Sequence, residues 1–267
     1  MSTATIQPES FGDLLRSWRQ RRRLSQLELS LGTGVSARHL SFLETGRAGP
    51  SREMVLQLAE HLEVPLRERN LLLAAAGFAP AYPQRPLDAP EMASVREAMD
   101  LVLRSHEPYP AIAVDRYWNI VAMNAAAGIF AAAVDSDLLG PPANVYRMSF
   151  HPKGLVPRIV NFTEYAHHLM SQLRHDVAVS GDPELTALLH EVESYGTVPP
   201  ASPHPHPQSV VLPMRVRHPI GELSVFSVIA TFGTPVDVTV SELAIETFFP
   251  ADAATAERLR RLADGAA

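Results

Sequence analysis

LSQLELSLGTGVSARHLSFLETGRAGPSREMVLQLAEHLEVP, residues 24–65, is the stretch of this chain that decides its fold. Ser25 lies three residues before Glu28, which is the spacing of a capping box at the start of a helix. That helix ends at Gly32-Thr33-Gly34, because glycine accepts the backbone angles of a tight turn. A second short helix follows directly, so the pattern predicts a helix-turn-helix.

Helices of the same kind surround this pair. Ser36 can cap the helix after the turn, from Ala37 to about Glu44. Ser10 can cap an earlier helix, and Ser51 stands before a fourth apolar repeat. Pro65 begins a fifth. The front of the chain is therefore predicted to be an all-α domain of five helices.

Charge separates the front of the chain from the rest. Residues 1–80 contain ten Arg and eight Asp or Glu, a net charge of +2, whereas residues 81–267 carry −8 of the total of −6. Only the front is therefore expected to meet phosphate. Four arginines, Arg19, Arg21, Arg22 and Arg23, close the first helix, either as a solvated helix end or as phosphate contacts.

The front domain resembles the Xre/Cro-type helix-turn-helix of phage repressors. The resemblance is carried by Gln-x-Glu-Leu at 26–29, by Val-Ser at 35–36 and by Leu-Glu-x-Gly-x-x-x-Pro-Ser at 43–51. It implies that the third helix enters the major groove of double-stranded DNA. An alternative is a helical bundle that kept the fold and binds protein. The DNA-contacting residues that the resemblance and their positions indicate are Gln26, Ser36, Ala37, Arg38, His39, Ser41, Phe42 and Arg47.

These residue types fit different parts of DNA. Arg38 could pair with guanine through two hydrogen bonds, and Ala37 or Phe42 could touch a thymine methyl group. Gln26, at a helix N-terminus, and Arg47 suit phosphate. One such unit contacts only a short half-site, so a homodimer is expected.

A proline-rich joint precedes a second domain. Residues 77–86 contain three prolines and are predicted to link a DNA-binding domain, 1–76, to a second domain, 87–267. The second domain begins with a predicted helix of about 90–105. Two strands near 112–114 and 118–122 follow, separated by a turn at Asp115 to Tyr117.

The remaining pattern completes an α+β domain. Asn124 can cap a helix of 125–133, Asn161 or Thr163 can cap a helix of about 164–179, and Asp182 can cap a third helix to about 194. Strands are predicted at about 210–217, 223–231 and 238–248, and a last helix at about 251–262. Two strands, helices and three strands resemble a PAS domain, which implies a five-stranded antiparallel sheet with helices on one side.

Nearly the whole chain resembles one family, the MmyB-like transcriptional regulators. The stretches that carry this resemblance are 71–82, 106–127, 150–162 and 217–252, which include LLLAAAGFAPAY, HEPYPAIAVDRYWNIVAMNAAA and FHPKGLVPRIVNF. The family implies an Xre-type helix-turn-helix joined to a PAS-related ligand-binding domain. A bound fatty acid or similar apolar molecule is therefore expected between sheet and helices, although a filled core that only dimerises or binds protein is the alternative.

Residues expected at such a ligand are mostly aromatic or aliphatic. A carboxylate head would need a charged or amide donor, for which Arg147, Asn161, His167, His168 and Arg174 are candidates. The expected ligand-binding residues are Tyr109, Trp118, Phe130, Arg147, Phe162, Tyr165, Leu169, Leu173 and Phe226.

Other functions have little support in the sequence. Cysteine is absent, so disulfides and thiolate metal sites are excluded. No metal is expected, because the adjacent His167 and His168 diverge on a helix, His175 lies two turns from His168, and His204 and His206 lie in a proline loop. No catalytic motif, required cofactor, secretory signal or membrane span is recognised, so a non-enzymatic, cytoplasmic protein is expected.

Overall fold

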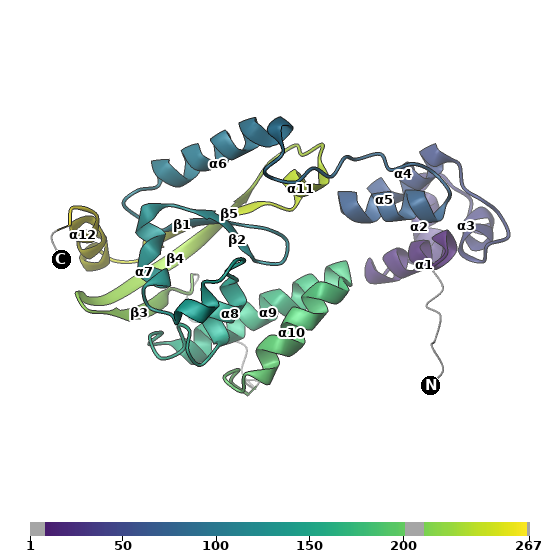
Figure 1. The fold of residues 1–267 in the computed structure, drawn as a ribbon. Helices are drawn as coiled ribbons and strands as arrows, with labels where there is room; N and C mark the ends of the chain where they lie inside the picture. The colour runs from purple at the N-terminus through teal and green to yellow at the C-terminus, as the bar shows by residue number, and fades with distance from the viewer. Residues whose placement is uncertain (1–8, 201–210, 266–267) are drawn as a thin grey trace, which may run out of the picture. The chain divides into compact units, whose positions relative to one another are not determined.

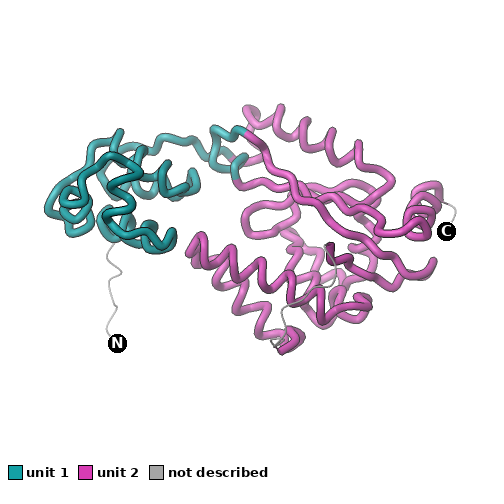
Figure 2. Tube along the Cα trace, turned by 180° about the vertical axis from the view of Figure 1, so that it is seen from behind, with its two compact units in different colours: residues 1–85, 234–241 teal, residues 86–233, 242–267 magenta. Residues whose placement is uncertain are grey.

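The computed structural model describes residues 9–200 and 211–265 (Figure 1). Two sequence predictions fall outside the described residues: the start of a strand at Val210, and the proline loop that contains His204 and His206. Contacts divide the chain into two compact units (Figure 2). Unit 1 is residues 1–85 with 234–241, and unit 2 is residues 86–233 with 242–267.

Unit 1 contains the predicted five-helix bundle. Its serine caps are all present: the side chains of Ser10, Ser25, Ser36 and Ser51 each accept a hydrogen bond from a backbone amide in the first turn. Ser25 and Glu28 form the complete capping box. The bundle has its own buried apolar core. Its helices are α1 (Phe11–Arg21), α2 (Gln26–Thr33), α3 (Ala37–Glu44), α4 (Arg52–His61) and α5 (Leu66–Ala75).

The proline-rich joint is packed onto unit 1, which differs from a free linker. Asn70 of α5 accepts hydrogen bonds from the amides of Ala81 and Tyr82 and donates one to the Tyr82 carbonyl. Contacts place the boundary between Arg85 and Pro86. They also add residues 234–241, which lie within the predicted second domain, to unit 1.

Unit 2 has the strand arrangement expected of a PAS-like domain. Its sheet is antiparallel in the order β2-β1-β5-β4-β3. The strands are β1 (Ala111–Val114), β2 (Ile120–Met123), β3 (Met214–His218), β4 (Gly221–Thr231) and β5 (Ala244–Pro250). The helices of unit 2 are α6 (Ala93–Ser105), α7 (Gly128–Ala131), α8 (Val145–Phe150), α9 (Phe162–Ser180), α10 (Pro183–Ser194) and α12 (Ala253–Ala263).

Alternation along the strands gives the sheet two different faces. Ile112 and Val114 of β1 belong to the large core shared with α8, α9 and α10. Ala111 and Ala113 belong to a smaller core with Met99 of α6. The expectation of helices on one side is therefore corrected, because α6 covers part of the opposite face (Figure 1).

Several predicted boundaries change in the structure. The predicted strand 238–248 is a helical turn, α11 (Val238–Ser241), followed by β5. The predicted strand 118–122 begins only at Ile120, and the helix α8 was not predicted. Asn161 does not cap α9 with its side chain, because its amide binds the Pro213 carbonyl and the Arg215 amide instead.

No helix among the described residues is long and apolar enough to cross a membrane. No group of three or more His, Cys, Asp or Glu residues within 9–200 and 211–265 could hold a metal ion.

Candidate functional site

The helix α3 presents its predicted DNA-contacting side chains on one side and its core residues on the other. Leu40 and Leu43 are fully buried in the bundle. The predicted DNA-contacting residues of the helix all reach solvent: Arg38 is exposed, and the half-buried ones are Ala37, His39, Ser41 and Phe42. Ser36 is exposed at the N-cap, where its hydroxyl accepts from the His39 amide.

Arg38 and Phe42 form one unit on this surface. They lie four residues apart on α3, so they share a face of the helix. The Arg38 guanidinium carbon lies 5.4 Å from the centre of the Phe42 ring, within range of a cation–π contact. This stacking orders the guanidinium at the first turn of α3, where base edges would be met.

Glu44, at the end of α3, joins three elements of the bundle. Its side chain is buried and accepts from Arg19 Nε at 2.6 Å, from Arg19 Nη2 at 2.8 Å and from Gln26 Nε2 at 2.9 Å. Burial opposes its ionisation, but the hydrogen bonds from Arg19 and Gln26 hold its pKa below the ordinary value. Gln26 is therefore fixed at the start of α2 by a buried carboxylate, and its phosphate contact stays a prediction.

The arginines that close α1 divide into structural and exposed ones. Arg19 belongs to the Glu44 network, and Arg22 donates to the carbonyls of Leu62 and Glu63. Arg21 lies over the Trp18 ring, with 5.0 Å from its guanidinium carbon to the ring centre. Arg47, beyond α3, is exposed. Arg19 and Arg22 thus hold the bundle together, while Arg47 remains available to a phosphate.

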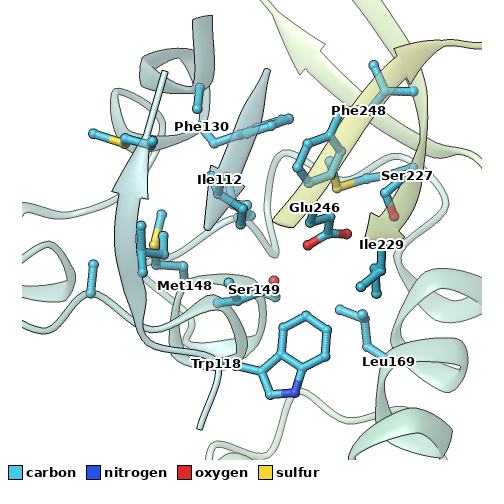
Figure 3. Close-up of a pocket in the computed structure, with 18 of the residues that line it drawn as sticks. Ile112, Trp118, Phe130, Met148, Ser149, Leu169, Ser227, Ile229, Glu246 and Phe248 are labelled. Atoms are coloured by element: carbon cyan, nitrogen blue, oxygen red, sulfur yellow. The ribbon is translucent and has the colours of Figure 1, made fainter. Parts of the chain in front are cut away.

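Unit 2 contains a cavity of about 760 Å³ between the sheet and the helices (Figure 3). Drug-sized ligands occupy pockets of roughly 300–1,000 Å³, so the space suits a small molecule. Its wall is mainly apolar. The side chains that Figure 3 labels around it are Ile112, Trp118, Phe130, Met148, Ser149, Leu169, Ser227, Ile229, Glu246 and Phe248.

A turn built on Asp115 places Trp118 at the cavity. The Asp115 carboxylate accepts from the amides of Tyr117 and Asn119 at 2.8 and 2.9 Å, which closes the turn between β1 and β2. Trp118 adopts a φ of +63°, in the left-handed region that few non-glycine residues occupy. Its indole Nε1 donates to Asp176 at 3.4 Å, which fixes the ring.

Five of the nine predicted ligand-binding residues lie at the cavity, namely Trp118, Phe130, Tyr165, Leu169 and Phe226. Phe226 only borders it, because its ring stacks on Phe249 at 5.6 Å, and these two cross-strand partners lie on the sheet face opposite Phe248. Whether these residues bind a ligand stays a prediction.

The other four predicted residues are corrected. Arg147 forms a bidentate ion pair with Glu191, at 2.8 and 2.9 Å. Leu173 is fully buried in the core, and Phe162 packs at its edge against Phe150. Tyr109 is directed elsewhere and accepts from Arg260. None of them lines the cavity.

Most of the residues predicted to bind a carboxylate head group interact with other parts of the protein. Asn161 holds β3, His167 contacts the Pro200 carbonyl, and Arg174 pairs with Glu193. Among the predicted anchors only His168 lines the cavity, where it is exposed.

Glu246 is the charged residue at this cavity that the sequence analysis missed. It belongs to β5, the central strand, and its side chain points into the cavity (Figure 3). The Ser227 hydroxyl favours its ionised form, but burial outweighs this and raises its pKa. Burial and this nearby carboxyl also raise the pKa of Tyr165. A glutamate inside the apolar run Ala244–Pro250 was the available signal.

The two units match two families of known domains. Residues 10–72 match a helix-turn-helix domain, and residues 95–262 match the MmyB-like transcription regulator ligand binding domain. The fold and these matches define a DNA-binding helix-turn-helix transcriptional regulator that carries a ligand-binding domain. Because the second match spans more than half of the chain, the protein belongs to the MmyB-like transcription regulators.

Individual relatives resemble part of the chain. It is 41% identical over 58 residues to an HTH-type transcriptional repressor RghR, and 35% identical over 82 residues to an uncharacterised HTH-type transcriptional regulator RghRB, both of Bacillus subtilis strain 168. These matches cover 21% and 30% of this chain. The chain spans only about half the length of these relatives, 43% and 57% respectively.

Among solved structures, the chain has a weak likeness to an RNA-binding light-oxygen-voltage receptor. It is 13% identical, with a TM-score of 0.25, over 96% of this chain and 63% of its own. A likeness this weak carries no argument about the fold.

Proposed function

We propose that this protein is a ligand-responsive regulator: it binds DNA sequence-specifically through α3 and a fatty-acid-like apolar molecule in the cavity of unit 2. The observation that supports ligand binding is the cavity itself, about 760 Å³ with a mainly apolar wall. Buried apolar groups normally fill such space, so an unfilled volume of this size suits a long apolar chain.

Regulation requires that the ligand distinguish two states of the protein. A ligand changes DNA affinity only if it binds the DNA-binding state and another state with different affinities. We further propose that the active species is a homodimer, because one α3 helix contacts only a short half-site. Light scattering of the free protein and of its DNA complex measures this stoichiometry.

The ligand is sought by native mass spectrometry of the purified protein, followed by thermal unfolding with a panel of fatty acids. A ligand at a hundred times its dissociation constant stabilises the folded state by about 2.7 kcal/mol, which raises the unfolding temperature by a few degrees.

Two neighbouring variants locate the binding. Ile229 is half-exposed and points into the cavity, so Ile229→Trp is expected to abolish the thermal shift. Val228 is equally exposed but alternates to the other sheet face and does not line the cavity, so Val228→Trp should leave the shift unchanged. An unliganded mass, with no shift for fatty acids or for uncharged and amine chains of the same length, would instead favour a unit that only dimerises or binds protein.

A further inference from the structure

The cavity has one carboxyl at the centre of its sheet wall. Glu246 lies on the central strand β5, opposite Ile112 of β1 and Ile229 of β4 in the strand register. Side chains at this cross-strand line share the face of the sheet that the cavity occupies. Figure 3 shows the two carboxyl oxygens of Glu246 directed into the open space between Phe248, Ile229 and Leu169.

The surroundings of the Glu246 carboxyl offer few groups that could balance a negative charge on it. Only 6% of Glu246 is exposed, and the uncharged Ser227 hydroxyl favours its ionised form from the same face of the sheet. The other ionisable groups near it are phenols, Tyr165 on α9 and Tyr146 on α8, both with raised pKa values. Among the described residues that line the cavity there is no lysine or arginine, and the histidine, His168, is exposed. A buried carboxylate without a cation is costly, so Glu246 either stays protonated or acquires a cation.

A carboxylate head group fits this environment poorly. Two carboxyl groups in one apolar site cannot both ionise. With Glu246 protonated, a fatty-acid carboxylate would be the one ionised group in the site, and the described lining offers it no lysine or arginine. A carboxylate could instead stay at His168, but then Glu246 would keep no partner.

We propose that Glu246 is the anchor for a basic nitrogen, so that the cavity selects a molecule with an apolar body and an amine head. The proposal rests on the proposed apolar ligand site in this cavity and replaces the carboxyl head of a fatty acid by an amine. Aromatic rings add to the fit: Trp118, Phe130 and Phe248 all line the same space, and their faces attract a desolvated ammonium.

Binding of this kind moves one proton. Burial favours the neutral carboxyl of Glu246 in the empty cavity, and a simple amine in water at pH 7 is an ammonium ion. When the ammonium enters, the carboxyl O–H bond breaks, its proton passes to the buffer, and a carboxylate–ammonium pair remains. The reaction therefore releases a proton that an uncharged ligand of the same length would not release.

The head-group preference is tested with three chains of equal length: decylamine, decanol and decanoate. Titration calorimetry at pH 7 gives the affinity of each, and repeating it in buffers of different ionisation enthalpy gives the number of protons released. The full-length protein is expected to bind decylamine tightest and to release up to one proton with it, and none with decanol. Glu246→Gln should weaken decylamine by roughly 30-fold or more, remove the proton release, and keep the decanol affinity, which shows that the cavity is intact.

Glu184→Gln is the matched control, because Glu184 is an exposed carboxyl that does not line the cavity. It should bind all three chains like the parent protein. Decanoate binding as tightly as decylamine, or decylamine binding unchanged in Glu246→Gln, would overturn the amine assignment while leaving the apolar ligand site standing. If none of the three chains binds, both the assignment and the proposed apolar ligand site are wrong.

Discussion

Arg38 stands at the first turn of α3 with its guanidinium stacked on Phe42. A guanidinium that pairs bidentately with guanine contributes about 1–3 kcal/mol of base discrimination. We therefore expect Arg38→Ala to weaken binding to the promoter upstream of its own gene by about 10- to 100-fold and to relax base preference, measured by gel shift.

Arg38→Lys separates base contact from phosphate contact. Lysine keeps the charge but not the planar pair of donors. If Arg38 pairs with a base, the lysine variant should lose most of the discrimination and keep the non-specific affinity. An affinity and a base preference equal to those of the parent protein in Arg38→Ala would refute the assignment of α3 as the recognition helix.

Glu44 makes the stability of the bundle depend on pH. Because its pKa in the folded state is lowered, its contribution is complete above its unfolded pKa of about 4.3 and is lost as the pH falls through the folded value. Glu44→Gln leaves Arg19 without its carboxylate and should cost about 3 kcal/mol at pH 7. The difference from the parent should shrink as the pH falls below about 4.

Trp18 fluorescence reports this unfolding. Trp18 is buried in the bundle and the other tryptophan of the chain, Trp118, can be replaced by phenylalanine to leave a single signal. Urea unfolding curves at several pH values then give the free energy of unfolding. A gap between Glu44→Gln and its parent that does not change with pH would contradict the role of the Glu44 carboxylate.

Contacts between residues close in the sequence could be predicted, whereas contacts between distant residues could not. The serine caps were found from the sequence because cap and amide lie three residues apart. Glu44 and Arg19 are 25 residues apart, and Arg147 and Glu191 are 44 apart, so no local pattern joins them. Arg147 was assigned to a ligand for this reason, because its true partner comes from another helix.

At the scale of elements, one arginine ties three segments of unit 2 together. Arg116, in the turn between β1 and β2, pairs with Asp182, the N-cap of α10, and with Glu242 before β5. All three side chains are largely buried. Since removing one member of a buried ionic group leaves the others uncompensated, Arg116→Ala should lower the free energy of unfolding of unit 2 by about 3 kcal/mol or more.

An exposed pair on the same unit is the comparison. Arg104 and Asp100, at 3.5 Å, are both exposed, so Arg104→Ala should cost less than about 0.5 kcal/mol. Trp118 fluorescence in a Trp18→Phe background follows unit 2 in urea. Equal costs for the two arginine variants would mean that the Arg116 group does not hold the segments together.

The strand predicted at 238–248 shows where element prediction failed. Val238, Val240 and the residues after them alternate as a strand would. In the structure Asp237 accepts from the Thr239 amide and its carbonyl accepts from the Ser241 amide, which closes a helical turn. Long-range contacts with residues 83–85 override the local preference here.

At the scale of the whole molecule, residues 234–241 hold the end of the joint. Arg85 pairs with Asp237 at 3.0 Å, the Thr239 hydroxyl donates to the Arg85 carbonyl, and the Val238 amide donates to the Pro83 carbonyl. The same segment connects β4 to β5, two strands that line the cavity. It therefore joins the cavity strands covalently to residues that contact the joint, which makes it a candidate route between the two.

Asp237→Asn tests this route, because it removes the ion pair while keeping the side-chain shape. We expect ligand affinity and DNA affinity, measured separately, to stay within about twofold. The ratio of DNA affinities with and without ligand, typically 5- to 150-fold in regulated proteins, should fall to about one. An unchanged ratio would show that the signal does not depend on this pair.

The membership of residues 234–241 in unit 1 also has a consequence for synthesis. The ribosome completes the helical bundle early, and the bundle has its own core. It adds the segment that fastens the joint only 156 residues after Arg85. At about 5–20 residues per second, a nascent chain spends roughly 10–30 s with a finished bundle while the end of the joint is not yet held by residues 234–241. In this protein the predicted DNA-contacting surface is therefore made well before the contacts at the end of the joint.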